Sequence, residues 1–304
     1  FIDRDHTSRT IMRTIALLLA ILATPAAAFA PVRSGAWVST RSHTSPALSM
    51  ADNLSEDEKR LNIANDDGDL KEQVTGDFKK IFVAGGSKGV GRELVSQLIA
   101  SGCTVKCLVR SEESAADLKA EGAICTMGDA FSYKDVEEAM DDCDACVTTL
   151  GGATGPDGKR VDYKGNSNVI EAAGILGVKR LVLVTSVGCG DSKGALSDEA
   201  YSSLEAALVE KDKAEKMLVK FYSITTDWTI VRPGGLMTAP ATGKAILTTD
   251  TTALGAINRA DVASLVAKCI NNKETIKKTL SAIDPSIETA FGNGNFGEAQ
   301  KFDV

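Results

Sequence analysis

Apolar runs alternate with amphipathic stretches along most of the chain, starting near residue 77. The first apolar run, 81–83, leads into a glycine-rich turn; residues 94–99 then carry apolar side chains at helical spacing, and a second apolar run covers 104–109. This order predicts a strand, a helix and a second strand, which together make one βαβ unit.

The alternation continues far beyond this unit. Further strands are expected at 123–127, 145–150 and 180–185, and a sixth strand is expected to start at residue 230 and to end in a Pro-Gly-Gly turn at 233–235. Helices are expected at 161–176 and from about 257 onward. Strands that alternate with helices in this way are typical of a parallel sheet covered on both faces. The pattern therefore predicts an α/β fold, a Rossmann-type doubly wound parallel sheet, in a single domain that spans residues 79–285.

The turn after the first strand has the spacing of a dinucleotide-binding motif. Gly85 permits a tight turn, Gly89 lets the backbone approach a pyrophosphate, and Gly91 lets the helix pack closely on the strand. Exposed amides and the positive end of the helix dipole then hold the phosphates. The predicted cofactor-binding residues of this turn are Gly85, Ser87, Lys88, Gly89, Val90 and Gly91.

The end of the second strand indicates which dinucleotide binds. NAD sites usually have Asp or Glu there, whereas this strand ends in Arg110 and Ser111, a pair suited to a 2′-phosphate. Lys88 adds a second positive charge from the glycine turn. The sequence therefore predicts NADP(H) as cofactor; the alternative is that both cations are ordinary surface residues.

Three further loops at the carboxyl ends of strands are expected to touch the cofactor. Asp129 follows the third strand, where it could hold the adenine amino group or simply form a turn. Gly151, in the loop after the fourth strand, is expected beside the ribose and pyrophosphate. Pro233 and Gly234 end the sixth strand, where backbone groups could meet the nicotinamide carboxamide.

Composition excludes several classes of function. The 304 residues carry a formal charge of −7, which argues against a nucleic-acid partner. The two histidines, His6 and His43, both precede the predicted domain, so we expect no histidine triad, Cys-His dyad or histidine-containing metal site. Seven cysteines without a framework spacing favour a reducing compartment. Cys143 and Cys146 form a CxxC pattern, which we interpret as structural because it enters a predicted strand.

The N-terminal segment has the composition of a targeting sequence. A basic residue, an apolar run and small residues between 12 and 28 indicate a signal peptide, and a Ser/Thr-rich stretch with arginines and no acids follows up to residue 50. In series, the two resemble the bipartite plastid presequence of diatoms and related algae. We expect 1–50 to be removed, 51–78 to be an acidic linker, and 286–304 to be a loosely ordered tail. The expected location is the plastid stroma, with secretion as the alternative and no transmembrane segment in the mature chain.

Four segments resemble one protein family. They are 83–95, 161–188, 227–236 and 242–266, and they are similar to atypical short-chain dehydrogenase/reductases, in particular the NmrA-like or NAD(P)-binding plastid branch. The resemblance covers about residues 79–285. It implies the Rossmann fold and cofactor binding, and it does not specify a substrate.

In this family a Ser and a Tyr-x-x-x-Lys pair carry out the chemistry. Ser186 and Lys211 match the Ser and the Lys, whereas Ala207 stands at the Tyr position. The resemblance thus implies that Ser186 contacts a carbonyl oxygen and that Lys211 also holds the nicotinamide ribose. Tyr201 or water would supply the proton.

Two functional hypotheses follow from this departure. The first is an NADPH-dependent reductase that transfers a hydride to a carbonyl or quinone-like substrate. The loops expected at 237–256 contain few ionisable groups, which favours a small, neutral substrate. The second is a non-catalytic NADP(H)-binding sensor or plastid assembly factor, with a protein partner in the plastid.

Overall fold

The computed structural model describes residues 77–155, 157–288 and 301–302. The predicted presequence and most of the predicted acidic linker lie outside the described residues. The first strand begins at Lys80, close to the predicted start of the domain.

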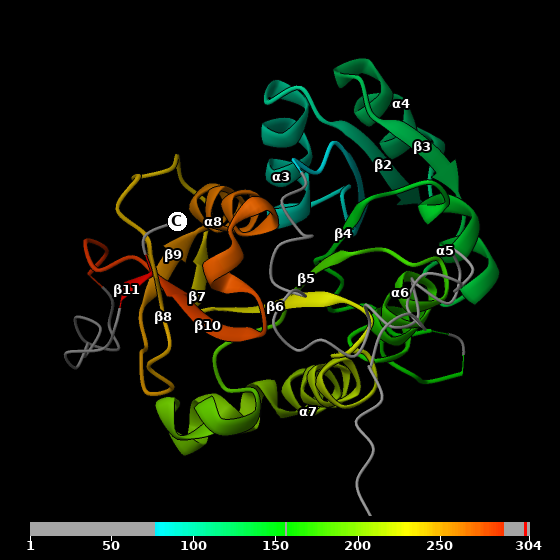
Figure 1. The fold of residues 1–304 in the computed structure, drawn as a ribbon. Coiled ribbons are helices and arrows are strands. Elements are labelled where there is room, and N and C mark those ends of the chain that lie inside the picture. The colour runs from blue at the N-terminus through cyan, green and yellow to red at the C-terminus, as the bar shows by residue number, and fades with distance from the viewer. Residues whose placement is uncertain (1–76, 156, 289–300, 303–304) are drawn as a thin grey trace, which may run out of the picture. The chain divides into compact units, whose positions relative to one another are not determined.

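A nine-stranded sheet forms the centre of the described fold (Figure 1). Its strand order is β11-β8-β10-β6-β5-β4-β1-β2-β3. The bounds are β1 (Lys80–Ala84), β2 (Thr104–Val109), β3 (Ile124–Met127), β4 (Ala145–Thr148), β5 (Arg180–Val184), β6 (Asp227–Pro233), β8 (Ile246–Thr248), β10 (Lys278–Ile283) and β11 (Lys301–Phe302). All neighbours from β3 to β10 pair in parallel, and β8 and β11 are antiparallel additions at one edge.

This topology confirms the predicted Rossmann-type sheet and corrects its C-terminal part. β6 ends at Pro233, in the predicted Pro-Gly-Gly turn. The residues after this turn were not predicted to form a strand, but they form β7 (Gly235–Met237), which pairs with β9 (Ala256–Asn258) in a separate small sheet. Part of the segment 237–256, expected to be loop, forms β8. Within the predicted loose tail, residues 301–302 pair with β8 as β11.

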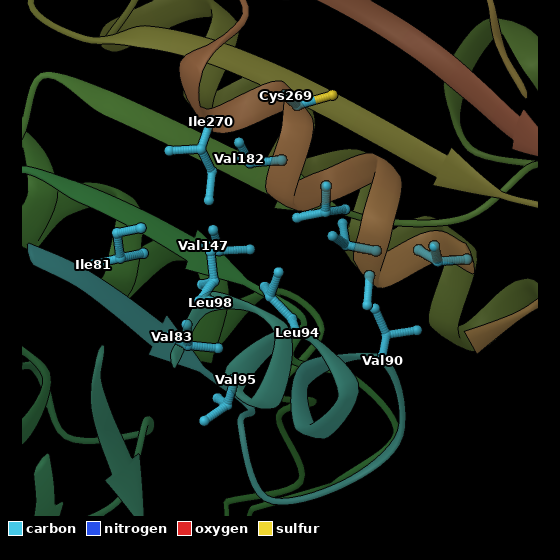
Figure 2. Close-up of a cluster of buried hydrophobic side chains, with 14 of the residues drawn as sticks. Ile81, Val83, Val90, Leu94, Val95, Leu98, Val147, Val182, Cys269 and Ile270 are labelled. Atoms are coloured by element: carbon cyan, nitrogen blue, oxygen red, sulfur yellow. The ribbon is translucent and has the colours of Figure 1, made fainter. Parts of the chain in front are cut away.

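Helices cover both faces of the large sheet. Apolar side chains of α3 (Gly89–Ala100), α4 (Glu112–Glu121) and α8 (Arg259–Asn271) pack on one face, and those of α5 (Tyr133–Met140), α6 (Lys164–Ile175) and α7 (Asp198–Phe221) pack on the other. Figure 2 shows the first of these layers, where Val90 and Leu94 of α3 lie beside α8. Both faces of the sheet are therefore buried, which explains the continuous apolar runs of its central strands.

The contact between α3 and α8 fixes the glycine turn relative to a distant segment. Gln97 Nε2 donates a hydrogen bond to the carbonyl oxygen of Ala260 at 3.1 Å, and Ser264 Oγ donates to Gln97 Oε1 at 3.1 Å. These polar contacts supplement the apolar packing. The start of α8 is thereby held beside the start of α3.

The cysteines of the CxxC pattern are part of the packing of β4. Cys146 is buried, and burial raises the pKa of its thiol; Cys143 is half-buried just before the strand. All seven cysteines are free thiols. No helix in the described part of the chain is both long and apolar enough to cross a membrane.

Candidate functional site

The glycine turn between β1 and α3 has the geometry that its sequence predicts. Gly85 has φ +84°, and a Cβ there would lie 2.7 Å from Thr149 Oγ1. A Cβ on Gly91 would lie 2.2 Å from the carbonyl oxygen of Gly85, so only glycine lets α3 approach the turn this closely. Gly89, with φ +57°, is exposed at the first position of α3. The turn therefore presents bare backbone at the start of a helix.

The start of α3 is also open to an anion. Ser111, Ser132 and Ser197 cap α4, α5 and α7 by accepting hydrogen bonds from backbone amides. At α3 the capping position is Lys88, whose side chain makes no capping hydrogen bond, and the first turn contains no acid. The first amides of a helix have no partner within it, so those of α3 are available to a phosphate.

A hollow on the β2 side of this turn contains most of the residues predicted to bind the adenosine end. We call it the β2-side hollow; its lining includes Gly85, Ser87, Lys88, Arg110, Asp129 and Gly151. Lys88 and Arg110 are both exposed, and neither has a carboxylate partner among the described residues. Ser111 lies outside this lining, and its hydroxyl caps α4 by accepting a hydrogen bond from the amide of Ser114.

A second hollow, the α7-side hollow, lies on the other side of the turn. It shares Lys88, Thr149 and Gly151 with the first, and it contains Gly89 and Val90 of the turn. Ser186, two residues after the end of β5, and Lys211, on α7, line it together with Pro233. The two predicted catalytic positions that match the family are therefore brought to one cavity beside the glycine turn.

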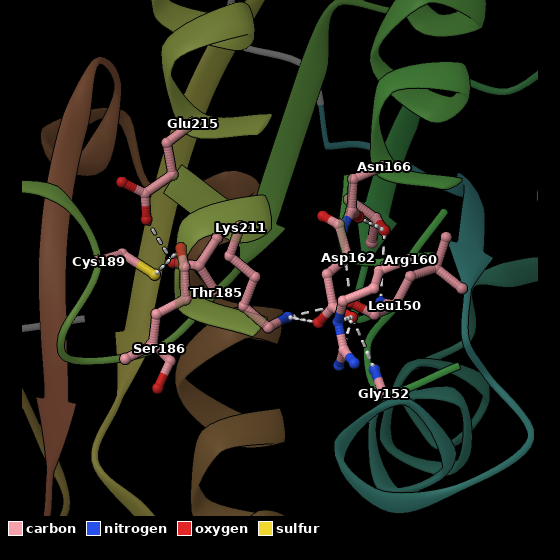
Figure 3. A network of polar contacts seen from close by, with 12 residues as sticks. Leu150, Gly152, Arg160, Asp162, Asn166, Thr185, Ser186, Cys189, Lys211 and Glu215 are labelled. Atoms are coloured by element: carbon pink, nitrogen blue, oxygen red, sulfur yellow. Dashed lines mark hydrogen bonds and ion pairs between the residues drawn. The ribbon is translucent and has the colours of Figure 1, made fainter. Parts of the chain in front are cut away.

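Asp162 organises this second hollow, although its role was not predicted. Its Oδ2 accepts hydrogen bonds from Arg160 Nε and from the amide of Gly152, each at 3.1 Å (Figure 3). Its Oδ1 lies 3.5 Å from Lys211 Nζ, which also donates to the carbonyl oxygen of Leu150 at 3.1 Å. The Asp162 side chain is only 1% exposed, and Oδ1 has no hydrogen-bond partner among the described residues. A buried acceptor without a hydrogen-bond partner, at the wall of a hollow, is suited to a hydroxyl of a bound ligand.

Besides Ser111, two more predicted residues, Tyr201 and Gly234, are placed differently from the rest. Tyr201 is not part of the lining of either hollow; Lys193 Nζ lies 4.0 Å from the centre of its ring. The amide of Gly234 donates to the carbonyl oxygen of Ala282, and a Cβ on Gly234 would lie 2.2 Å from the carbonyl oxygen of Gly255. In this structure Gly234 therefore joins β6 to β10 and to the segment before β9, and its amide is not free for a carboxamide.

A buried ion-pair network lies behind Ser186. Arg232 on β6 donates to both carboxylate oxygens of Glu215 on α7, at 3.1 and 2.6 Å, and it also pairs with Asp191. Thr185 Oγ1 donates to Glu215 Oε1 at 2.6 Å. Burial alone would lower the pKa of Arg232, but the carboxylates of Glu215 and Asp191 outweigh this effect and raise it. The network holds β5, β6, α7 and the segment after Ser186 together.

Sequence reasoning also missed Arg160 and Arg259, which line the α7-side hollow. One signal was available for Arg259. It is the first residue of α8, where a positive charge is repelled by the positive end of the helix dipole and destabilises the fold. An unfavourable charge at such a position indicates a role other than stability.

Comparison with known proteins agrees with this geometry. Residues 85–273 match the NAD(P)H-binding family. An uncharacterized sugar epimerase of Bacillus subtilis is 33% identical over 64% of this chain and 90% of its own length. An uncharacterized chloroplastic protein of Arabidopsis thaliana is 33% identical over 67% of this chain and 76% of its own length. The photosystem II assembly factor Ycf39 of Synechocystis is 27% identical over 67% of this chain and 62% of its own length.

A solved structure has the same fold over the whole of its length. The anaerobilin reductase ChuY of Escherichia coli superposes with a TM-score of 0.63 and is 31% identical, covering 70% of this chain and all of that one.

Proposed function

The chain belongs to the NAD(P)H-binding family, and we propose that it is an NADPH-dependent reductase of the atypical short-chain type that reduces a small, neutral carbonyl or quinone-like substrate. We further propose that it acts in the plastid stroma. The chloroplastic relative and the composition of residues 12–50 support this location.

One observation carries the proposal: Ser186, Lys211 and the open glycine turn meet at a single cavity. The residues present fit a dinucleotide, because glycine leaves a cradle that side chains would fill and because Asp162 Oδ1 is a buried acceptor without a hydrogen-bond partner among the described residues. Bound NADPH would supply the hydride. The amides of the turn would hold its pyrophosphate, and Lys88 and Arg110 would hold the 2′-phosphate.

The residues of the α7-side hollow would then orient the substrate and the ribose. The Ser186 hydroxyl, which in this structure donates to the carbonyl oxygen of Val187 at 2.9 Å, would turn to donate to the substrate oxygen. Lys211 and Asp162 would bind the ribose hydroxyls as donor and acceptor. Leu204 of α7 and Leu236 of β7 form an exposed apolar rim, which suits an uncharged substrate. The proton would come from water or from Tyr201 after a movement of α7.

Steady-state oxidation of NADPH with a panel of quinones and aldehydes tests the activity. We expect turnover with at least one of them, a strong loss of kcat in Lys211→Met and Ser186→Ala, and an unchanged fold by circular dichroism. Retention of NADPH without turnover on any member of the panel would refute the reductase proposal.

The choice of NADPH has a separate test. Arg110 is exposed and has no acidic partner among the described residues, so we expect Arg110→Ala to leave the fold intact and to weaken NADPH binding about tenfold or more, with little change for NADH. Fluorescence titration measures both constants. Equal losses for the two coenzymes would contradict the assignment of Arg110 to the 2′-phosphate.

A second candidate function rests on the absent tyrosine. Ala207 lines the α7-side hollow at the position where reductases of this type carry their proton donor. A protein with this departure could bind NADP(H) as a sensor or as an assembly factor with a protein partner in the plastid, and the relative Ycf39 is named an assembly factor. The same titration and turnover experiment separates the two functions.

A further inference from the structure

We propose that Arg259, at the start of α8, is a pyrophosphate-binding residue that closes the cofactor site from the side opposite the glycine turn. The proposal rests on the proposed function, because it requires that a pyridine dinucleotide occupies the turn. It adds a second, distant segment of the chain to the phosphate site.

The position of Arg259 is the first argument. Arg259 lines the α7-side hollow together with Lys88, Gly89 and Val90. A Cβ built on Gly89 would lie 3.7 Å from Arg259 Nε and 3.8 Å from its Cδ. The guanidinium therefore faces the residue at which the turn exposes its backbone. The hydrogen bonds of Gln97 to Ala260 and Ser264 keep the start of α8 in this place.

The hydrogen bonding of Arg259 is the second argument. Its Nη1 donates to Thr238 Oγ1 at 2.6 Å and to the carbonyl oxygen of Leu236 at 3.5 Å. Among the described residues, Nε and Nη2 have no hydrogen-bond partner, and no carboxylate forms an ion pair with this side chain. Nη1 thus fixes the position of the guanidinium, while Nε and Nη2 remain available to donate hydrogen bonds to a ligand. A guanidinium fork with free donors is suited to the paired oxygens of a phosphate.

The charge around the turn is the third argument. Arg160 and Lys211 also line this hollow, but Asp162 partly neutralises both. Lys88 and Arg259 have no such partner within the described ranges. Lys88 occupies the capping position of α3, whose first turn contains no acid, and Arg259 is the first residue of α8, whose first turn also contains Asp261. A positive charge at a helix start adds to the positive end of the dipole. An anion between the two helix starts would remove this repulsion. A pyrophosphate, with two charges, fits the place better than a neutral group.

Binding of four nucleotides to Arg259→Ala tests the proposal. NADPH, NADH and 2′-phospho-ADP-ribose all carry the pyrophosphate. In 2′,5′-ADP only one phosphate of the pyrophosphate, the one on the adenosine 5′ carbon, is present. We expect Kd to rise about tenfold to a hundredfold, by the same factor, for the first three, and to change much less for 2′,5′-ADP. Arg259→Lys keeps the charge and loses the guanidinium fork, so its Kd for the three pyrophosphate-containing ligands should lie between those of the wild type and Arg259→Ala.

Two controls keep the result interpretable. Lys268→Ala removes an exposed cation from the last turn of the same helix and should leave all four constants unchanged. Arg110→Ala should discriminate between NADPH and NADH, which Arg259→Ala should not. Unchanged binding of both coenzymes in Arg259→Ala, or an equal loss for 2′,5′-ADP and 2′-phospho-ADP-ribose, would overturn the role of Arg259. Failure of the unmodified protein to bind either coenzyme would instead refute the proposed function itself.

Discussion

Removing Arg232 should cost this fold more stability than removal of any exposed cation. Arg232 and Glu215 are 7% and 6% exposed at their side chains, and two hydrogen bonds join them. In Arg232→Met the Glu215 carboxylate would stay buried with Thr185 Oγ1 as its remaining donor. Breaking a buried pair by removing one partner costs about 3–5 kcal/mol, because the other charge is left uncompensated. For a domain of this size, that corresponds to a fall in Tm on the order of 10 °C.

Urea unfolding followed by circular dichroism measures this loss. The midpoint should fall while the m-value stays the same, since the surface exposed on unfolding does not change. The double variant Arg232→Met/Glu215→Met should regain most of the lost stability, because an apolar pair can replace a buried ion pair.

A matched control is the ion pair between Lys216 and Asp212 on the surface of α7. Lys216 Nζ lies 2.6 Å from Asp212 Oδ2, and the lysine side chain is 73% exposed. Lys216→Met should cost less than about 1 kcal/mol, because water screens this pair. If Arg232→Met were no more destabilising than Lys216→Met, or if the double variant were less stable than the single one, our account of the network would be wrong.

Two further predictions concern the cofactor side of the fold. Gly91→Ala places a methyl group 2.2 Å from the carbonyl oxygen of Gly85, so α3 must shift and NADPH affinity should fall at least tenfold. Gly194→Ala is the control: its methyl group meets no atom within 4 Å, so this variant should bind NADPH normally in the same titration. The pKa of Asp135 lies below its usual value because the Asp129 amide and the Ser132 hydroxyl donate to it. A carboxyl group whose pKa is lowered by folding contributes its full stabilisation above the unfolded pKa of about 3.9. This stabilisation is lost as the pH falls through the folded pKa. Wild type should therefore be more stable than Asp135→Asn at pH 7, and this difference should close below about pH 4 in thermal melts; a difference independent of pH would mean that these two hydrogen bonds do not cause the shift.

The central part of the sheet could be predicted from the sequence because its strands are covered on both faces. Such strands appear as short, continuous apolar runs, as in β1 and β5. The edge beyond β6 gave no such signal. β10 carries Lys278, Thr279 and Ser281, and the hydroxyl of the buried Ser281 is satisfied by donating to the carbonyl oxygen of Asp250. Polar residues whose hydrogen bonds come from distant segments break the pattern on which the prediction depends.

The same reasoning explains which parts of the candidate site the sequence could indicate. The glycine turn is local, so its spacing alone indicates its geometry. Ser111 shows the limit of local reasoning, since a serine between a strand and a helix is equally a helix cap, and in this fold it is one. Asp162 and Arg259 reach the site only through the tertiary fold, and no spacing relates residue 259 to residue 89.

Lys88 and Arg259 also explain why we expect a bound ligand to stabilise this site. Lys88 and Arg259 start two helices that pack side by side, and each opposes a helix dipole at a cost of about 0.3–1 kcal/mol. Stability alone would favour Ser, Asp or Asn at the capping position that Lys88 occupies, since Ser111, Ser132 and Ser197 cap α4, α5 and α7. Arg259 follows the capping position of α8, which is Asn258. A bound anion would turn these unfavourable charges into favourable ones, so we expect replacement of either cation to weaken coenzyme binding and to stabilise the free protein slightly.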